Sequence, residues 1–289
     1  MLPLLASVAG AADEPWRQAA LAFLGQAAPS FGLILARTAG MLQQAPVLGS
    51  RTVPATARAG LTLMLSIIYW TTLETAPAVP DTIMLFSLAL FLEFLTGLLF
   101  GFAAMLMFYG FQAAGELVAQ QTGLSMMTTL NPSLRTQTTA VGNLFFYLSQ
   151  FAFLAIGGYL WFLQGYYQTF ELVPLGGFRL TQHVWLATSQ VVVSFFLITV
   201  QIAMPAIMVM FLVDFGLGII NRSSPAVSNI LEIVQAVKPT VGFMLLILMV
   251  PNTIGAVGQW ADRFLRQAQS IMILDSSTAP RMELFRPIR

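Results

Sequence analysis

The chain has 289 residues, of which 57% are hydrophobic and 9% charged, with a net charge of +1 and a mean hydropathy of +0.78. Because an ordinary soluble domain carries about 25% charged residues, this composition predicts an integral membrane protein. Nucleic-acid binding is not expected, since basic residues do not cluster and Lys238 is the single lysine. The lack of cysteine excludes disulfides, thiolate metal sites and cysteine nucleophiles. The N-terminus has no positive segment before its apolar patch, so no cleaved signal peptide is expected.

Two apolar segments come first. Residues 16–48 are interrupted by Pro29 and Arg37. Residues 59–73 would span only about 22 Å as a helix, which is short of the ~30 Å hydrocarbon core. This second segment is therefore expected to begin before Arg58 or to pack inside protein. The connection 74–81 contains two acids and two prolines and is predicted to be non-cytoplasmic.

The third apolar segment, residues 83–111, is long enough to cross a membrane at a tilt. It contains Glu93, and a charge at such depth usually faces protein or water. Gly97 and Gly101 form a GxxxG pattern, on which another helix can approach closely. Together these residues predict that this helix packs against protein.

The central stretch 112–142 is the polar interruption of an otherwise apolar chain. A lipid-facing segment cannot carry irregular backbone and polar side chains, so this stretch is expected to line or block a pathway as a re-entrant loop. The alternative is an exposed loop between two membrane helices. We favour the first interpretation because the stretch has its own apolar face, made of Leu124, Met126, Met127, Leu130 and Leu134.

Three apolar segments follow. Residues 141–163 are expected to form an uninterrupted span, and residues 164–183 a connection with a turn at Gly176-Gly177 and a solvated His183. Residues 184–220 are either one helix bent at Pro205 or two shorter helices. Asp214 in this segment needs a partner. Residues 239–257 form the last apolar segment, and the tail from residue 262 is expected to be soluble.

The orientation of the chain conflicts with a simple count of crossings. The Lys/Arg rule places the connection at Arg51 and Arg58 and the arginine-containing tail on the cytoplasmic side. Six simple crossings would place the C-terminus on the other side. One segment is therefore expected to be re-entrant, broken or doubled, and the segment with Pro205 is the first candidate.

No catalytic constellation is present in the sequence. Asp214-Phe-Gly216 matches a kinase triplet, but the accompanying kinase motifs are missing, as are Walker A, HExxH and GxSxG patterns. Neither an enzyme nor a cofactor or metal is expected. One non-enzymatic alternative is a secondary transporter that uses Glu93, Glu116 and Asp214 as proton or ion carriers. No internal repeat of the kind common in transporters supports it.

Short motifs in a fixed order resemble the FliR/SctT family, the export-gate proteins of bacterial type III secretion. The resemblance covers about residues 93–239 and leans toward the injectisome branch, SctT. Two departures are Thr139-Ala140 in place of a Ser-Pro pair and Ala226 in place of a glutamine. The motifs are Glu93-Phe-Leu-Thr-Gly97, Gly101-Phe102, Gly115-Glu116, Gln121-x-Gly123, Leu130-Asn131-Pro132, Gln137-Thr138, Gly142, Met204-Pro205-Ala206, Met210, Asp214-Phe215, Gly218, Asn221-Arg222 and Pro225.

The resemblance implies an all-α membrane protein of kinked helical hairpins. Residues 1–261 would form the export-gate domain, with a FliP/SctR-like unit (1–183) fused to a FliQ/SctS-like hairpin (184–260), followed by a polar tail (262–289). The implied role is a multi-pass, non-enzymatic subunit of the inner-membrane export gate, within the secretion basal body. Its implied partners are FliP/SctR-like, FliQ/SctS-like and FlhB/SctU-like subunits and unfolded substrates in transit.

The resemblance also implies a plug loop at residues 123–138. Flexible methionines are suited to sealing a pore and repacking around different chains, and an apolar constriction also gates by dewetting. Ordinary core packing is the alternative role for Met126 and Met127. The plug would comprise Leu124, Met126, Met127, Leu130, Asn131, Pro132 and Arg135, with Arg135 able to pair with Glu116. Buried polar and helix-packing roles are expected for Glu93, Gly97, Gly101, Glu116, Gln121, Pro205, Asp214, Asn221, Arg222 and Lys238.

Overall fold

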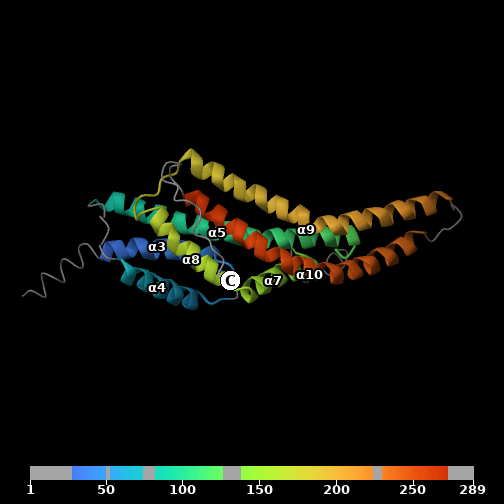
Figure 1. The fold of residues 1–289 in the computed structure, drawn as a ribbon, viewed down its shortest axis with the longest axis horizontal. Coiled ribbons are helices and arrows are strands. Elements are labelled where there is room, and N and C mark those ends of the chain that lie inside the picture. Colours follow the sequence, from blue (N-terminus) through green and yellow to red (C-terminus); the bar gives the residue numbers. More distant parts are fainter. Residues whose placement is uncertain (1–27, 50–52, 74–81, 126–137, 224–229, 273–289) are drawn as a thin grey trace, which may run out of the picture. The chain divides into compact units, whose positions relative to one another are not determined.

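The computed structural model describes residues 28–49, 53–73, 82–125, 138–223 and 230–272 (Figure 1). Within these ranges all regular structure is helical, which confirms the predicted all-α class. The helices are α3 (Ala28–Gln44), α4 (Ala55–Thr72), α5 (Ile83–Thr122), α7 (Ala140–Ala155), α8 (Gly158–Leu172), α9 (Gln182–Ser223) and α10 (Ile230–Met272). Helix α4 begins before Arg58, as its short apolar segment predicted.

Three helices among the described residues are long and apolar enough to cross a membrane: α5, residues 182–220 of α9 and residues 237–272 of α10. A fourth candidate is the pair of α7 and α8, which are bent by 78° at a short break. In each of the three long helices, only 28% of the most apolar window is buried inside the chain. The remaining apolar surface must therefore face lipid or other proteins.

The chain divides into two compact units, here called the first and the second unit. The first unit comprises residues 1–101, 166–181 and 272–289, and the second comprises residues 102–165 and 182–271. Helices α5 and α8 are continuous, and each contributes one part to the first unit and the other part to the second unit. Fully buried apolar side chains fill the core of the first unit, among them Leu33, Ile34, Met41, Phe100 and Phe178.

Helices α3 and α5 lie backbone to backbone in the first unit. A Cβ atom on Gly97 would meet the carbonyl oxygen of Arg37, and one on Gly40 would meet the carbonyl oxygen of Phe94. A Cβ on Gly101 would lie 2.6 Å from the carbonyl oxygen of Met41. Only glycine fits at such contacts, so the GxxxG surface of α5 is where α3 packs.

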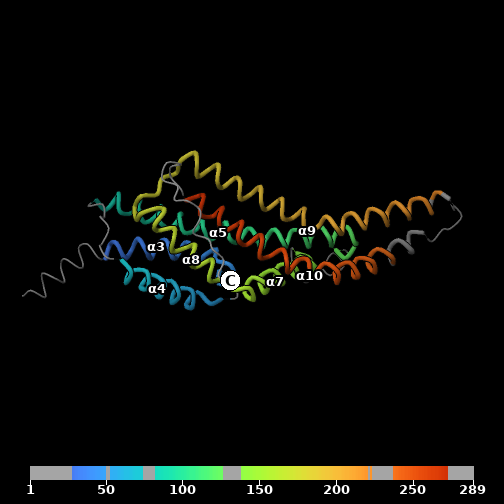
Figure 2. Tube along the Cα trace, in the orientation of Figure 1, coloured from blue at the N-terminus to red at the C-terminus, as the bar shows by residue number. Residues whose placement is uncertain are grey.

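The second unit contains the rest of α5 together with α7, α9 and α10. Phe108 on α5 packs edge-on against Phe153 on α7, with ring centroids 5.3 Å apart. Helices α9 and α10 run antiparallel as a long hairpin, and α9 changes direction near its middle (Figures 1 and 2). Pro205 lies inside α9. The structure thus decides between the two alternatives for residues 184–220, because α9 is a single helix that continues through its proline.

The expected uninterrupted span at residues 141–163 is wrong. Gly157 adopts φ +75°, a conformation that L-residues with a side chain rarely adopt, and α7 ends there. Helix α8 then continues in a new direction to Leu172, so residues 164–172 are helical and not part of a connection. The predicted turn is confirmed, since Gly176 has φ +77° and the Gly177 N–H donates to the Pro174 carbonyl at 2.9 Å.

Two further boundaries differ from expectation. Residues 112–122 form the last turns of α5, so the central interruption begins only at Gly123. Helix α10 continues through Pro239 and Pro251 to Met272, and Phe264, Leu265 and Ala268 are buried. A polar tail therefore begins no earlier than residue 273.

Candidate functional site

The candidate site is the base of the central loop, where α5 ends and α7 begins in the second unit. Helix α5 ends at Thr122, and Gly123 adopts the left-handed conformation (φ +76°) that is typical of the residue after a helix. The N–H of Gly123 donates to the Gln120 carbonyl at 3.4 Å, and that of Ser125 to the Ala119 carbonyl at 3.2 Å. These bonds satisfy carbonyls that the helix end would otherwise leave without partners.

Helix α7 begins with a side-chain cap. Thr139 has an extended conformation, and its Oγ1 accepts a hydrogen bond from the Gly142 N–H at 3.0 Å. Threonine at this position satisfies one of the first N–H groups of the helix. The Thr138 hydroxyl donates to Oδ1 of Asn143 at 3.1 Å, which orients the residue just before the cap.

Glu116 of α5 joins the two ends of the loop. Its Oε1 accepts a hydrogen bond from the backbone N–H of Thr139 at 2.7 Å. In an ordinary capping box the acid that accepts from this N–H lies three residues into the same helix. Here the position holds Gly142, and the carboxylate comes from a different helix. The negative charge at the N-terminus of α7 is further stabilised by the helix dipole.

Two glycines allow this close approach of α5 and α7. A Cβ atom on Gly142 would collide with the carboxylate of Glu116, and it would lie 2.8 Å from the Cδ atom. A Cβ atom on Gly115 would lie 2.8 Å from the Val141 carbonyl oxygen. The Gly115-Glu116 and Gly142 motifs are therefore two sides of one contact.

Helix α10 also reaches the base of the loop. The position of a Cβ atom on Gly242 is filled by the side chain of Thr122, which is fully buried in the last turn of α5. The loop thus starts at a point where three helices of the second unit meet. Residues 126–137, which include Met126, Met127, Leu130, Asn131, Pro132 and Arg135, lie outside the described residues. Of the expected plug, only Leu124 is described, and it is half-buried in the turn after α5.

A second polar cluster lies in the first unit, around Glu93. Its Oε2 is 2.5 Å from Nε of Arg37, and both side chains are fully buried. Oε1 accepts from the Gly176 N–H at 2.7 Å. Nη1 of Arg37 donates to the carbonyls of Thr169 and Val173 at 3.1 and 3.0 Å. One ion pair thus joins α3, α5, the end of α8 and the turn that follows.

Next to this ion pair lies a chain of hydroxyl groups. Oγ1 of Thr38 lies 2.7 Å from the Tyr166 hydroxyl. The Ser66 hydroxyl donates to the same Oγ1 of Thr38 at 3.1 Å. The guanidinium of Arg37 lies over the Phe170 ring, 4.3 Å from its centroid. Sequence reasoning did not assign a role to Arg37. The signal that could have found it is the same one that drew attention to Glu93, a charged residue inside an apolar segment.

The remaining predicted residues lie near the ends of α5, α9 and α10. Asp214 pairs with Lys238, with Nζ and Oδ1 2.6 Å apart and side chains 42% and 26% exposed. This is the partner that the sequence required for Asp214. Arg222 is exposed in the last turn of α9, and Asn221 precedes it in the same turn. Gln121 is exposed in the last turn of α5. In the described ranges, no group of three or more His, Cys, Asp or Glu side chains is placed to hold a metal ion.

The fold and these contacts define an all-helical, multi-pass membrane protein in which charged and polar side chains join helices inside apolar surroundings. Comparisons with known proteins identify the family to which the chain belongs. The sequence profile of bacterial export proteins, family 1, matches residues 28–264. The chain therefore belongs to this family, to which FliR and SctT proteins belong, and it is a multi-pass protein of the bacterial inner membrane in flagellar and type III protein export.

Relatives come from both branches of the family. The chain is 30% identical to the flagellar biosynthetic protein FliR of Escherichia coli, over 75% of this chain and 82% of that protein. It is 26% identical to FliR of Bacillus subtilis, over 76% and 85%. It is 27% identical to the Yop proteins translocation protein T of Yersinia pestis, again over 76% and 85%. The chain is thus similar to members of both branches to a comparable degree.

Proposed function

We propose that the chain is a structural subunit of the type III export channel and that residues 123–138 form a plug that closes it. The observation that carries this proposal is the hydrogen bond from the Thr139 N–H to Glu116. It holds the start of α7 against the last turns of α5. A segment whose two ends are fixed at neighbouring helix ends returns to where it began, as a re-entrant loop does.

The position of this loop base supports a role in closing a passage. Irregular backbone at membrane depth is stable only when it is buried in protein or lines a wet cavity. The loop base is built from two long apolar helices, α5 and α10, and from α7. The apolar face of this loop, with Met126 and Met127, would exclude water and ions at rest at such a place, and it would repack around a passing chain.

The same proposal includes partners and a division of the chain. Long apolar surfaces on α9 remain exposed, and they support association with other export-apparatus subunits, which we propose to be FliP/SctR-like, FliQ/SctS-like and FlhB/SctU-like proteins. The exposed side chains include Phe196, Val200, Met204, Phe211 and Phe215. In this proposal residues 1–183 correspond to a FliP/SctR-like unit, and residues 184–260 to a FliQ/SctS-like hairpin.

The contacts of the three carboxylates argue against the alternative of a secondary transporter. Glu93 is neutralised by Arg37, Asp214 pairs with Lys238, and Glu116 caps a helix. Each carboxylate thus has a fixed partner within the chain. A carrier must instead bind and release its proton or ion in each cycle.

The test is the double variant Met126→Gly/Met127→Gly, expressed with the other export subunits. We expect the resting membrane to become permeable to small ions while the assembled complex is recovered at its usual yield. The matched control is Met126→Leu/Met127→Leu, which keeps apolar bulk and is expected to keep the seal. Unchanged permeability in the glycine variant would remove the plug assignment. Genes for FliP-, FliQ- and FlhB-like proteins beside this one would test the partners.

A further inference from the structure

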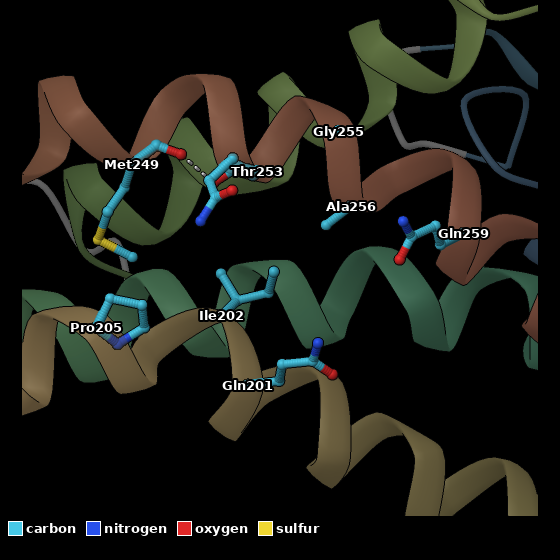
Figure 3. A pocket seen from close by; sticks show the side chains of 9 residues that line it. Gln201, Ile202, Pro205, Met249, Thr253, Gly255, Ala256 and Gln259 are labelled. Carbon is cyan, nitrogen blue, oxygen red and sulfur yellow. Dashed lines mark hydrogen bonds between the residues drawn. The ribbon is translucent and has the colours of Figure 1, made fainter.

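A pocket of about 310 Å³ lies between α9 and α10 in the second unit. Figure 3 shows its lining, with Gln201 and Pro205 from α9 facing Thr253 and Gln259 from α10. Three amide side chains line it, those of Gln201, Asn252 and Gln259, and none of its lining residues is charged. The site is thus neutral and rich in hydrogen-bonding groups, and it opens to the surface of two helices apolar enough to cross a membrane, because Gln201, Asn252 and Gln259 are exposed.

Pro205, which lines the pocket, changes the backbone hydrogen bonding of α9. Proline has no N–H, so the carbonyl of Gln201, four residues earlier in α9, lacks the donor that a regular helix would supply. A backbone group left unsatisfied in hydrocarbon costs several kcal/mol. The hydroxyl of Thr253 is not the donor for the Gln201 carbonyl, because it donates to the Met249 carbonyl at 2.9 Å (Figure 3).

The pocket interrupts a line of polar contacts along the α9–α10 interface. On one side of it, the Gln267 amide donates to the Ser194 hydroxyl at 2.8 Å. On the other side, Lys238 pairs with Asp214 at 2.6 Å. The amides of the pocket therefore continue a polar interface that has a hydrogen bond at one end and an ion pair at the other, and Oε1 of Gln267 at the first end is buried without a partner.

We propose that this pocket is a hydration site, in which a cluster of water molecules is held by Gln201, Asn252 and Gln259. Acyl chains offer no hydrogen bonds to amides, and a charged headgroup would meet no opposite charge. At about 30 Å³ per molecule, the volume accommodates on the order of ten waters. Water at this place satisfies the Gln201 carbonyl, so that α9 keeps its bend inside apolar surroundings. This proposal does not depend on the plug assignment.

The test uses the natural lack of cysteine in the chain. Single variants Ala256→Cys, Val257→Cys and Leu248→Cys are placed in the assembled complex in its membrane and exposed to a small charged thiosulfonate reagent. Ala256 lines the pocket, its neighbour Val257 is fully buried, and Leu248 is 66% exposed on the apolar surface of α10. Because only the thiolate reacts, and it forms only in contact with water, we expect Ala256→Cys to react at least about tenfold faster than both controls.

A second arm tests the role of the amides. In the Ala256→Cys background, the replacements Gln201→Met and Gln259→Met keep side-chain size but remove hydrogen bonding, and they are expected to lower the labelling rate at least about fivefold toward the controls. If Ala256→Cys without the methionine replacements is labelled as slowly as Leu248→Cys, lipid or a partner side chain fills the pocket, and the proposal is overturned. A rate unaffected by the two methionines would also overturn it, since the amides would then not hold the water.

Discussion

Arg37 on α3 and Glu93 on α5 form an ion pair that is completely buried, with Nε and Oε2 2.5 Å apart. The two residues are 56 positions apart in the sequence. The second oxygen of Glu93 accepts from the Gly176 N–H, and Nη1 of Arg37 donates to the carbonyls of Thr169, in α8, and Val173, just after it. Since both ends of the pair hold backbone groups, this contact positions the chain segments of the first unit, rather than only balancing charge.

The first prediction concerns this pair. Glu93→Gln leaves a buried guanidinium without its counter-charge, and breaking a buried pair in this way costs roughly 3–5 kcal/mol. We expect a large fall in the amount of folded protein and in its thermal stability in detergent. The double variant Arg37→Met/Glu93→Leu removes both charges and is expected to recover part of the loss. A single variant as stable as the parent protein would contradict this role.

The second prediction concerns the contact of α3 with α5. Gly97→Ala places a methyl group against the Arg37 carbonyl, so the helices must separate, and we expect about 2 kcal/mol or more of destabilisation from overpacking. The matched control is Gly60→Ala on α4, where a Cβ atom would meet nothing within 4 Å. There, higher helix propensity is expected to stabilise by up to about 1 kcal/mol. Thermal unfolding of both variants is the measurement, and equal effects would refute the close packing.

The third prediction concerns the cap of α7. Thr139→Ala removes the oxygen that accepts from the Gly142 N–H and is expected to destabilise the helix start by about 1 kcal/mol. Thr139→Ser keeps the oxygen and is expected to behave like the parent. Hydrogen exchange at the first residues of α7 measures the effect, and the serine and alanine variants must differ if the cap is formed.

The fourth prediction separates the charge of Glu116 from its hydrogen bond. Glu116→Gln keeps an acceptor for the Thr139 N–H but loses the favourable interaction with the helix dipole, which is worth about 0.3–1 kcal/mol. Glu116→Ala loses both and is expected to free the start of α7 from α5. We expect exchange at the Thr139 amide to increase slightly in the glutamine variant and strongly in the alanine variant. The reverse order would exclude Glu116 as the link between the two loop ends.

The fifth prediction concerns Asp214 and Lys238. Both side chains are partly exposed, so solvent weakens their attraction and a coupling energy of no more than about 1 kcal/mol is expected. A double-mutant cycle with Asp214→Asn and Lys238→Met measures it in the purified protein. The coupling is expected to fall as salt is raised. A coupling of several kcal/mol would contradict the partly exposed position of this pair.

The apolar segments were predictable to within a few residues where their ends coincide with a change in hydropathy, as at the start of α5. Their ends were misjudged where polar residues continue a helix. Residues 112–122 are polar yet helical, because α5 extends beyond its most apolar part and packs there against Val141 and Gly142 through Gly115. The charged residues at 262–272 predict a polar tail, whereas Phe264, Leu265 and Ala268 form a buried stripe at helical spacing.

The bend between α7 and α8 could not be predicted from hydropathy, because the apolar residues continue across it. The local signal was the pair Gly157-Gly158, which is of the same kind as the pair Gly176-Gly177 that predicted a turn. The partner of Asp214 was a different case. The sequence required one, and Lys238, as the single lysine, was a short distance away along the hairpin.

Hydropathy and motif order can be read along the chain, so they were enough to predict an all-helical membrane protein of the export family. They also predicted that charges inside apolar segments have partners. The identity of these partners came from the fold: Arg37 for Glu93, and the backbone of Thr139 for Glu116. The physical reason is that an ion pair or a cap depends on the distance between atoms in space, and helix packing brings together residues that the sequence keeps far apart.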